Sequence, residues 1–120
     1  MHNILVVDDQ PINLTLAKGF LSDEYSIIPV TSGEQALKYL ETKVPDLILL
    51  DIMMPEIDGI ETMKKIKENP SLDAVPIIML SAEYDEKVIE ECKACGAVDF
   101  VSKPFSKPKL KEAVAKALAQ

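Results

Sequence analysis

Several residue types are scarce or missing in this chain. It has no tryptophan, three phenylalanines, four glycines and two cysteines, and all of its 13 basic residues are lysine. Two cysteines in 120 residues do not suggest a disulfide framework. Without arginine, the chain has no planar guanidinium for bidentate capture of phosphate. No apolar run approaches the roughly 20 residues of a membrane span, and no charged-then-apolar leader opens the chain, so we expect a cytoplasmic location and no membrane contact.

The charge of the chain is negative and unevenly distributed. Twenty acidic residues against 13 lysines give a net charge of −7. The acidic excess lies wholly in residues 1–60, and the sequence pI is about 4.7, so we expect no direct nucleic-acid binding by this domain. The hydrophobic fraction of 48% is ordinary for a soluble globular protein, and the length predicts one domain, residues 1–120.

Five short apolar runs recur along the chain, and most are continuous rather than alternating. Continuous runs are typical of strands that are covered on both faces. The runs are Ile4–Val7, Ile27–Val30, Leu47–Leu50, Ile77–Leu80 and Val98–Val101. A segment with helical spacing follows each run, which predicts an α/β fold of five βα units with a parallel sheet between two helical layers. Pro29 lies inside the second run, and because proline is tolerated mainly in edge strands, it fits the doubly wound strand order 2-1-3-4-5.

Each predicted helix has an apolar stripe that we expect to face the core. In the first helix, Ile12, Leu16 and Phe20 align with Ala17 and Leu21. The later stripes contain Ala36, Leu37 and Leu40; Ile60, Met63 and Ile66; Val88, Ile89, Cys92 and Cys95; and Leu110, Val114, Ala117 and Leu118. Ser32 and Gln35 form an S-x-x-Q capping signal before the second helix.

Polar side chains follow the apolar runs, where open parallel sheets bind their ligands. Asp8 and Asp9 follow the first run, Asp51 the third, Ser81 the fourth and Lys103 the fifth. In the order 2-1-3-4-5 the first and third strands are neighbours, so three carboxylates converge on one crevice. Crowded carboxylates need a positive charge between them, and an all-oxygen ligand set with room for water suits Mg²⁺. A magnesium ion beside a carboxylate, a serine and a lysine is typical of phosphoryl transfer, with the carboxylate as nucleophile.

Simpler interpretations compete with this one. Asp9, which precedes Pro11, could serve simply as the cap of the following helix, without a chemical role, because aspartate is a common N-cap residue. Asp58-Gly59 reads as a turn and a helix N-cap without chemistry. The C-x-x-C of Cys92 and Cys95 falls late in a predicted helix, where both sulfurs belong to the apolar stripe, so we expect neither redox activity nor a zinc site.

The motifs VVDD, LLDIMMPEIDG, IIMLSA and VDFVSKPF, in this order and at these intervals, resemble the receiver domain of bacterial two-component response regulators. The resemblance covers essentially the whole chain. It implies a flavodoxin-like (βα)₅ fold and a switch that takes a phosphoryl group from a histidine kinase or a phosphotransfer protein. It also implies that the chain is not an enzyme in the usual sense, because its only chemistry is its own phosphorylation and dephosphorylation.

The resemblance also assigns roles to individual residues. It implies that Asp51 is the phospho-acceptor, and that Asp8, Asp9, Asp51 and the backbone carbonyl of Met53 hold Mg²⁺. Lys103 would contact the phosphoryl group, and the Lys103–Pro104 peptide is expected to be cis, as X-Pro bonds can be.

The conformational switch would consist of Ser81, whose hydroxyl turns toward the phosphoryl group, and Phe100. Phe100 has no hydroxyl where many members carry tyrosine, which leaves a steric switch. Met53 and Glu83 match positions that tune dephosphorylation in the family.

The family often dimerises or docks its targets on the fourth helix, fifth strand and fifth helix. In this chain the last helix is rich in lysine, with Lys107, Lys109, Lys111 and Lys116. A solvated helix face is the simpler interpretation of these charges, and a surface for a downstream target or a second copy is the functional one.

Three other functions remain open. A Mg²⁺-dependent hydrolase with an aspartate nucleophile would want a second aspartate two residues after it as acid and base, and that position is Met53. A flavodoxin-like carrier of FMN would need a Ser/Thr/Gly-rich loop after the first strand, where this chain has the acidic DDQPIN. The third is a receiver-like domain that is never phosphorylated, against which the complete set of site residues argues.

Overall fold

The third strand, β3 (Leu47–Asp51), is buried at each of its five positions because it lies in the middle of a sheet that helices cover on both sides. The computed structural model describes residues 1–54, 57–81 and 86–119. In chain order the elements are β1 (Asn3–Val7), α1 (Pro11–Leu21), β2 (Ser26–Val30), α2 (Gly33–Leu40), β3 (Leu47–Asp51), α3 (Gly59–Lys67), the 3₁₀ turn η1 (Pro70–Leu72), β4 (Ile77–Ser81), α4 (Glu86–Ala94), β5 (Asp99–Ser102) and α5 (Lys107–Leu118).

The strands form one parallel sheet in the order β2-β1-β3-β4-β5, as the sequence predicts. Pro29 lies in the edge strand β2, where it pairs with Val6 of β1. The interpretation of this proline is therefore confirmed. The pairing of Asp51 with Leu80 and of Ser81 with Ser102 extends β3 and β4 one residue past their apolar runs. Asp51 and Ser81 are therefore the last residues of their strands, held in place by the backbone ladder.

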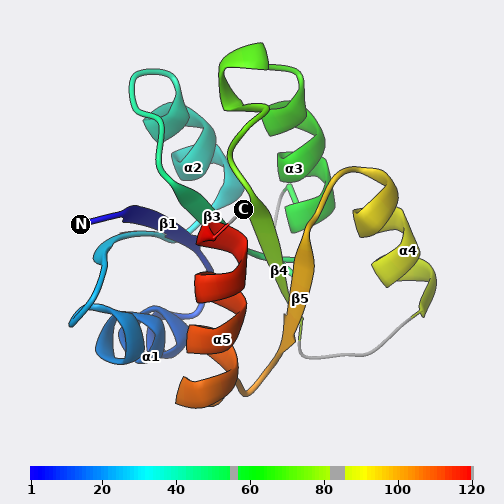
Figure 1. Ribbon diagram of the computed structural model, residues 1–120. Helices are drawn as coiled ribbons and strands as arrows, with labels where there is room; N and C mark the ends of the chain where they lie inside the picture. The colour runs from blue at the N-terminus through cyan, green and yellow to red at the C-terminus, as the bar shows by residue number, and fades with distance from the viewer. Residues whose placement is uncertain (55–56, 82–85, 120) are drawn as a thin grey trace.

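Two apolar cores lie on opposite faces of the sheet. Helices α1 and α5 cover one face, and α2, α3 and α4 cover the other (Figure 1). Alternate residues of each strand supply the two cores: Leu49 packs with the α1 and α5 side, and Leu50 packs with the α2, α3 and α4 side. This alternation fixes which side chain at the end of each strand is available to a ligand.

The first helix differs from its predicted orientation. Ala17 and Leu21 are fully buried, as expected, but the side chain of Ile12 is 66% exposed. Helix α1 is apolar nearly all round, because Lys18 is its one charged residue. The apolar residues of this helix therefore do not define a single face that must be buried. The prediction that Ile12 faces the core was wrong.

Smaller features differ as well. Ser32 caps α2 by accepting a hydrogen bond from the backbone N–H of Gln35, but the Gln35 amide oxygen accepts from Thr31 rather than from Ser32. Strand β5 begins at Asp99, and the preceding Val98 is 47% exposed although its N–H donates to Ile77.

Cys92 is buried, and Cys95, just beyond the end of α4, packs half-buried against the same core; both thiols are free. Burial raises the pKa of the Cys92 thiol to about 11, so it remains a neutral thiol at physiological pH.

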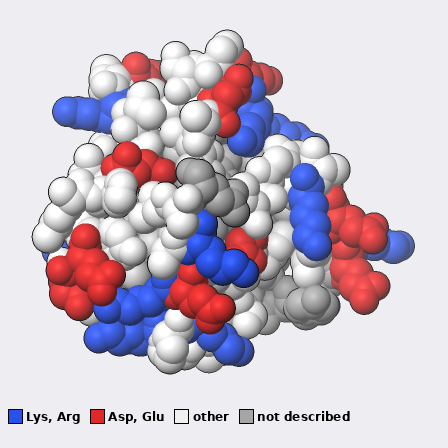
Figure 2. Space-filling view, viewed as in Figure 1, with Lys and Arg blue, Asp and Glu red and all other residues white. Residues whose placement is uncertain are grey.

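Charged side chains are mixed on the visible surface. Figure 2 shows lysines and acidic residues interleaved over this face rather than gathered into one field of a single sign. None of the helices in the described part of the chain is long and apolar enough to cross a bilayer.

Candidate functional site

A hollow of about 370 Å³ lies at the carboxyl ends of the strands. It is lined by Asp9, Gln10, Asn13, Asp51, Met53, Lys103 and Pro104. The first three residues come from the loop between β1 and α1 and from the first turn of α1. Asp51 ends β3, and the remaining three follow β3 and β5. The hollow thus lies where the strand order reverses between β1 and β3, which is the usual ligand position in such sheets.

Asp8 precedes the lining residue Asp9 and is completely buried. Its backbone N–H donates to Val30 at the edge strand, and its Oδ1 accepts from the backbone N–H of Gln10 at 2.9 Å. Its Oδ2 lies 2.7 Å from Lys103 Nζ as an ion pair, and it accepts no well-aligned hydrogen bond from the described residues. A fully buried carboxylate oxygen with spare capacity is a good ligand for a cation.

Lys103 places its ammonium between two buried carboxylates. Its Nζ is 2.7 Å from Asp8 Oδ2 and 3.0 Å from Asp51 Oδ1, and its side chain is only 11% exposed. The backbone N–H of Lys103 donates to Ser81 at 2.7 Å, which fixes the start of this side chain at the end of β4. One ammonium therefore pairs with the carboxylate directly after β1 and with the carboxylate at the end of β3.

Asp51 is 2% exposed and has a perturbed acidity. Its pKa is raised from 3.8 to about 6, mainly by burial; the hydrogen bond and charge of Lys103 oppose this shift, the charge of Asp8 adds to it, and the Met53 N–H opposes it. The Met53 N–H donates to Asp51 Oδ1 at 3.3 Å. Asp51 is thus held in one orientation with limited charge compensation, so a further cation would favour its ionised form.

The donor set fits a divalent cation. Carboxylate oxygens of Asp8, Asp9 and Asp51 all lie within 4.8 Å of one another. Three carboxylates and one ammonium leave two negative charges when all are ionised, and a hard divalent ion neutralises both. Oxygen ligands beside an open hollow with space for water suit Mg²⁺, which keeps several waters when bound.

Comparison with known proteins agrees with this geometry. The sequence profile of the response regulator receiver domain matches residues 4–115. The chain belongs to the response regulator receiver domain family. PhoP of Bacillus subtilis, an alkaline phosphatase synthesis transcriptional regulatory protein, is 43% identical over 86% of this receiver domain and 42% of its own length.

Two solved structures illustrate the likeness. The chemotaxis protein CheY4 of Vibrio cholerae superposes with a TM-score of 0.94 and 28% identity, over 98% of this receiver domain and 99% of that chain. The receiver domain of the sensor histidine kinase PA1611 of Pseudomonas aeruginosa PAO1, which has a magnesium ion coordinated in its active-site cleft, gives 0.91 and 30%, over 99% and 98%. The receiver domain spans less than half the length of the first curated relatives that it matches.

The structure brings most of the sequence-predicted site residues together. Asp8, Asp9, Asp51 and Lys103 surround one point, and the Lys103–Pro104 peptide is cis. Asp9 does not cap α1, because Gln10 occupies the N-cap position and no side chain caps that helix. Glu83 lies outside the described residues.

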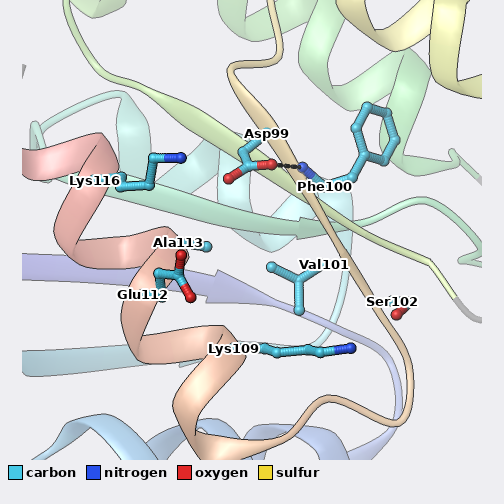
Figure 3. A pocket seen from close by; sticks show the side chains of 8 residues that line it. All are labelled: Asp99, Phe100, Val101, Ser102, Lys109, Glu112, Ala113 and Lys116. Carbon is cyan, nitrogen blue, oxygen red and sulfur yellow. Dashed lines mark hydrogen bonds between the residues drawn. The ribbon is translucent and has the colours of Figure 1, made fainter.

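Neither of the two predicted switch residues lines the hollow above Asp51. Ser81 ends β4, the strand next to Asp51, and is half-buried. Phe100 in β5 is half-buried against the core of α2, α3 and α4. Figure 3 shows its ring on the side of β5 away from α5.

The sequence did not assign Gln10, Asn13 or Gly59 to the site. Gln10 and Asn13 line the hollow because Pro11 starts α1 directly after the acidic pair. At Gly59 a Cβ atom would overlap the backbone carbonyl of Asp51, and its N–H donates to Ile52 at 2.9 Å. The Asp58-Gly59 pair was interpreted as an N-cap, which the bond from Glu61 N–H to Asp58 Oδ1 confirms. The close approach of Gly59 to the backbone of Asp51 and Ile52 also shows that the start of α3 packs against the end of β3.

A second hollow, of about 260 Å³, lies between β5 and α5. Figure 3 shows Lys109, Glu112 and Lys116 projecting from α5 toward β5, where Asp99 and Val101 lie. The Asp99 carboxylate accepts from the Phe100 N–H at 2.7 Å. This surface carries two lysines and two acids, so it has charge of both signs and little net charge.

Proposed function

We propose that residues 1–120 form one receiver domain that accepts a phosphoryl group on Asp51 from a histidine kinase or a histidine phosphotransfer protein. The observation that carries the proposal is the single ammonium of Lys103 held between the buried carboxylates of Asp8 and Asp51. An ordinary structural ion pair needs one carboxylate, whereas this arrangement gathers three beside an open hollow.

The step is a transfer between two protein side chains. A carboxylate oxygen of Asp51 forms a bond to phosphorus while the phosphorus–nitrogen bond of the donor's phosphohistidine breaks, and the electron pair of that bond stays on the imidazole. Lys103 neutralises charge on the phosphoryl oxygens, and the Met53 N–H, which is bound to Asp51 Oδ1, holds the carboxylate in place. Loss of the group to water restores Asp51. The domain is thus a signalling switch whose chemistry is confined to itself.

Asp8, Asp9, Asp51 and the backbone carbonyl of Met53 would hold Mg²⁺. When bound, the ion supplies charge neutralisation and orients the phosphoryl oxygens. The buried Oδ2 of Asp8, without a well-aligned hydrogen bond from the described residues, supports this assignment.

Phosphorylation would be read out through Ser81 and Phe100. A phosphoryl group on Asp51 adds acceptor oxygens next to the end of β4, so the Ser81 hydroxyl turns toward it and Phe100 moves inward into the space that is vacated. The surface of α4, β5 and α5 changes with Phe100, and a downstream target or a second copy would bind there. The hollow between β5 and α5, which is lined by charged residues of both signs, supports the proposal that a partner binds there. The proposal includes the cytoplasmic location expected from the sequence.

The test is intact mass after incubation with acetyl phosphate and Mg²⁺. We expect one phosphoryl adduct, which is lost in Asp51→Asn and in the presence of a chelator. Asp73→Asn is the matched control, because Asp73 is an exposed aspartate at the end of η1. An adduct that persists in Asp51→Asn would disprove the assignment of the acceptor.

A further inference from the structure

Met53 is the one methionine of the chain that is both open to solvent and part of the site. The chain has five methionines, and the structure describes all of them. Met54, Met63 and Met79 are buried. Met1 is 84% exposed, but it precedes β1, at the end of the sheet opposite to the hollow. Met53 is 66% exposed, and it lines the hollow at the carboxyl ends of the strands.

The backbone of Met53 is fixed, whereas its side chain is exposed. The N–H of Met53 donates to Asp51 Oδ1 at 3.3 Å. The neighbouring side chains of Ile52 and Met54 pack into the core of α2, α3 and α4, but Met53 stays exposed between them. The Met53 side chain is therefore open to small molecules in water, on a residue that is hydrogen-bonded to Asp51.

An exposed thioether has one characteristic reaction, which is oxidation to the sulfoxide. A lone pair of the sulfur attacks one oxygen of hydrogen peroxide, and the O–O bond breaks. The second oxygen leaves as hydroxide, which takes the proton of the transferred oxygen and becomes water. The sulfur loses two electrons and the peroxide gains them. The product is a polar, chiral side chain in place of a flexible apolar one.

The two thiols are the other side chains that a peroxide oxidises readily. Cys92 is buried, and burial raises its pKa to about 11, so it is almost entirely in the unreactive thiol form. Cys95 is half-buried against the same core. Neither cysteine lines the hollow above Asp51. Of the sulfur-containing side chains, Met53 alone combines access with a place at the site.

A sulfoxide on Met53 would add an acceptor oxygen beside a group of acceptors. Asp8, Asp9 and Asp51 gather three carboxylates there, and the Lys103 ammonium already contacts two of them. Phosphoryl oxygens are acceptors as well, so the sulfoxide oxygen offers them no donor, and its partial negative charge repels them. The same oxygen binds water, which has to leave the hollow before a phosphoryl donor enters. Both effects slow transfer to Asp51.

We propose that Met53 is a modification site, at which a peroxide converts the side chain to the sulfoxide and thereby lowers the rate of phosphorylation of Asp51. The inference rests on the proposed function, because the modification acts on transfer to Asp51. Enzymes of the methionine sulfoxide reductase class reverse the oxidation. The modification is therefore a reversible redox input to the same switch.

The experiment compares acetyl phosphate labelling before and after mild treatment with hydrogen peroxide. The proteins are the wild type, Met53→Leu, and a double variant with Met53→Leu and Val44→Met. After the peroxide is removed with catalase, oxidation at each methionine is measured by peptide mass. Val44 is exposed and precedes β3, so the double variant carries an exposed methionine at the opposite end of the sheet. Each treated protein is compared with its own untreated sample, because Met53 belongs to the site.

We expect Met53 to be oxidised before the buried methionines, and the labelling rate of the wild type to fall about fivefold or more. Treated Met53→Leu and the treated double variant should stay within about twofold of their own untreated rates, although the double variant is oxidised at position 44. Reductases for the two sulfoxide epimers should restore the rate of the treated wild type. All three proteins keep Cys92 and Cys95, so an effect of thiol oxidation would appear in each of them.

Several results would overturn the proposal. Labelling of the treated wild type at its untreated rate would do so, as would oxidation of the buried methionines before Met53. An equal slowing in Met53→Leu would assign the effect to another group, such as Cys95, and a rate that the reductases do not restore would exclude the sulfoxide as its cause. If acetyl phosphate fails to label the untreated wild type, the proposed function itself falls, and this inference with it. A failure confined to the treated samples removes this inference alone.

Discussion

Replacing Asp51 by asparagine should make the metal-free protein more stable at neutral pH. Asp51 has a pKa of about 6 in the folded chain, against 3.8 for an unperturbed aspartate, mainly because it is buried. The folded state therefore disfavours the ionised carboxylate. About two pKa units at 1.36 kcal/mol each give a penalty on the order of 3 kcal/mol at pH 7. The asparagine side chain would carry no charge, and Lys103 would keep its ion pair with Asp8.

The pH dependence has a definite sign. Between pH 4 and 6 the folded wild type binds more protons than the unfolded chain, so its free energy of unfolding falls as the pH rises through this window. Above pH 6 the full penalty is present, and below about pH 4 it is absent. The advantage of Asp51→Asn should therefore be largest at pH 7 and shrink toward zero at pH 4.

Urea unfolding with a chelator, at pH 7 and at pH 4, measures this difference. We expect Asp51→Asn to gain about 1 to 3 kcal/mol at pH 7, since the asparagine amide recovers only part of the penalty. Asp73→Asn, at an exposed site, should change stability by less than about 0.5 kcal/mol. The reasoning is refuted if Asp51→Asn is no more stable than the wild type at pH 7, or if its advantage is as large at pH 4. Adding Mg²⁺ should narrow the gap, because the ion stabilises the folded wild type.

Other substitutions test the remaining supports of the site. Lys103→Met leaves Asp8 and Asp51 buried without a cation, so the free energy of unfolding at pH 7 should fall by about 3 kcal/mol in the chelator and recover partly at pH 4; a loss equal at both pH values would contradict the ion-pair argument. Gly59→Ala should cost about 1 to 3 kcal/mol in urea unfolding and slow acetyl phosphate labelling, because the new methyl group displaces the Asp51 backbone; unchanged labelling would separate α3 from the site. Asp58→Ala should cost about 1 kcal/mol by loss of the α3 cap, whereas Asp58→Asn, which keeps an acceptor, should restore most of it in the same assay.

Much of the fold follows from local sequence pattern. Continuous apolar runs such as Leu47–Leu50 predict buried parallel strands, because a strand that is covered on both faces needs apolar residues at every position. Pro29 identifies an edge strand, because proline has no backbone N–H to donate. The ends of strands were less predictable. Asp51 and Ser81 continue the ladder after the apolar runs end, since strand pairing depends on the neighbouring strand and not on hydrophobicity.

The site was predictable in its members but not in its contacts. Strand order alone brings Asp8, Asp51 and Lys103 to one edge of the sheet. That the ammonium contacts both carboxylates depends on the path of the chain after β5, which no spacing in the sequence gives. Ile12 was placed wrongly because a helix that is apolar on nearly every side does not reveal its inner face.

The double contact of Lys103 also has a mechanical meaning. The residue lies directly after the edge strand β5, three positions beyond Phe100. Its ammonium reaches past β4 to Asp51 at the end of β3 and to Asp8, which follows β1. The side chain links two buried carboxylates to the peptide that leads from β5 into α5. A change in charge at Asp51 changes one of the two ion pairs that hold the Lys103 ammonium. We therefore expect a change of charge at Asp51 to alter the path of the chain between β5 and α5.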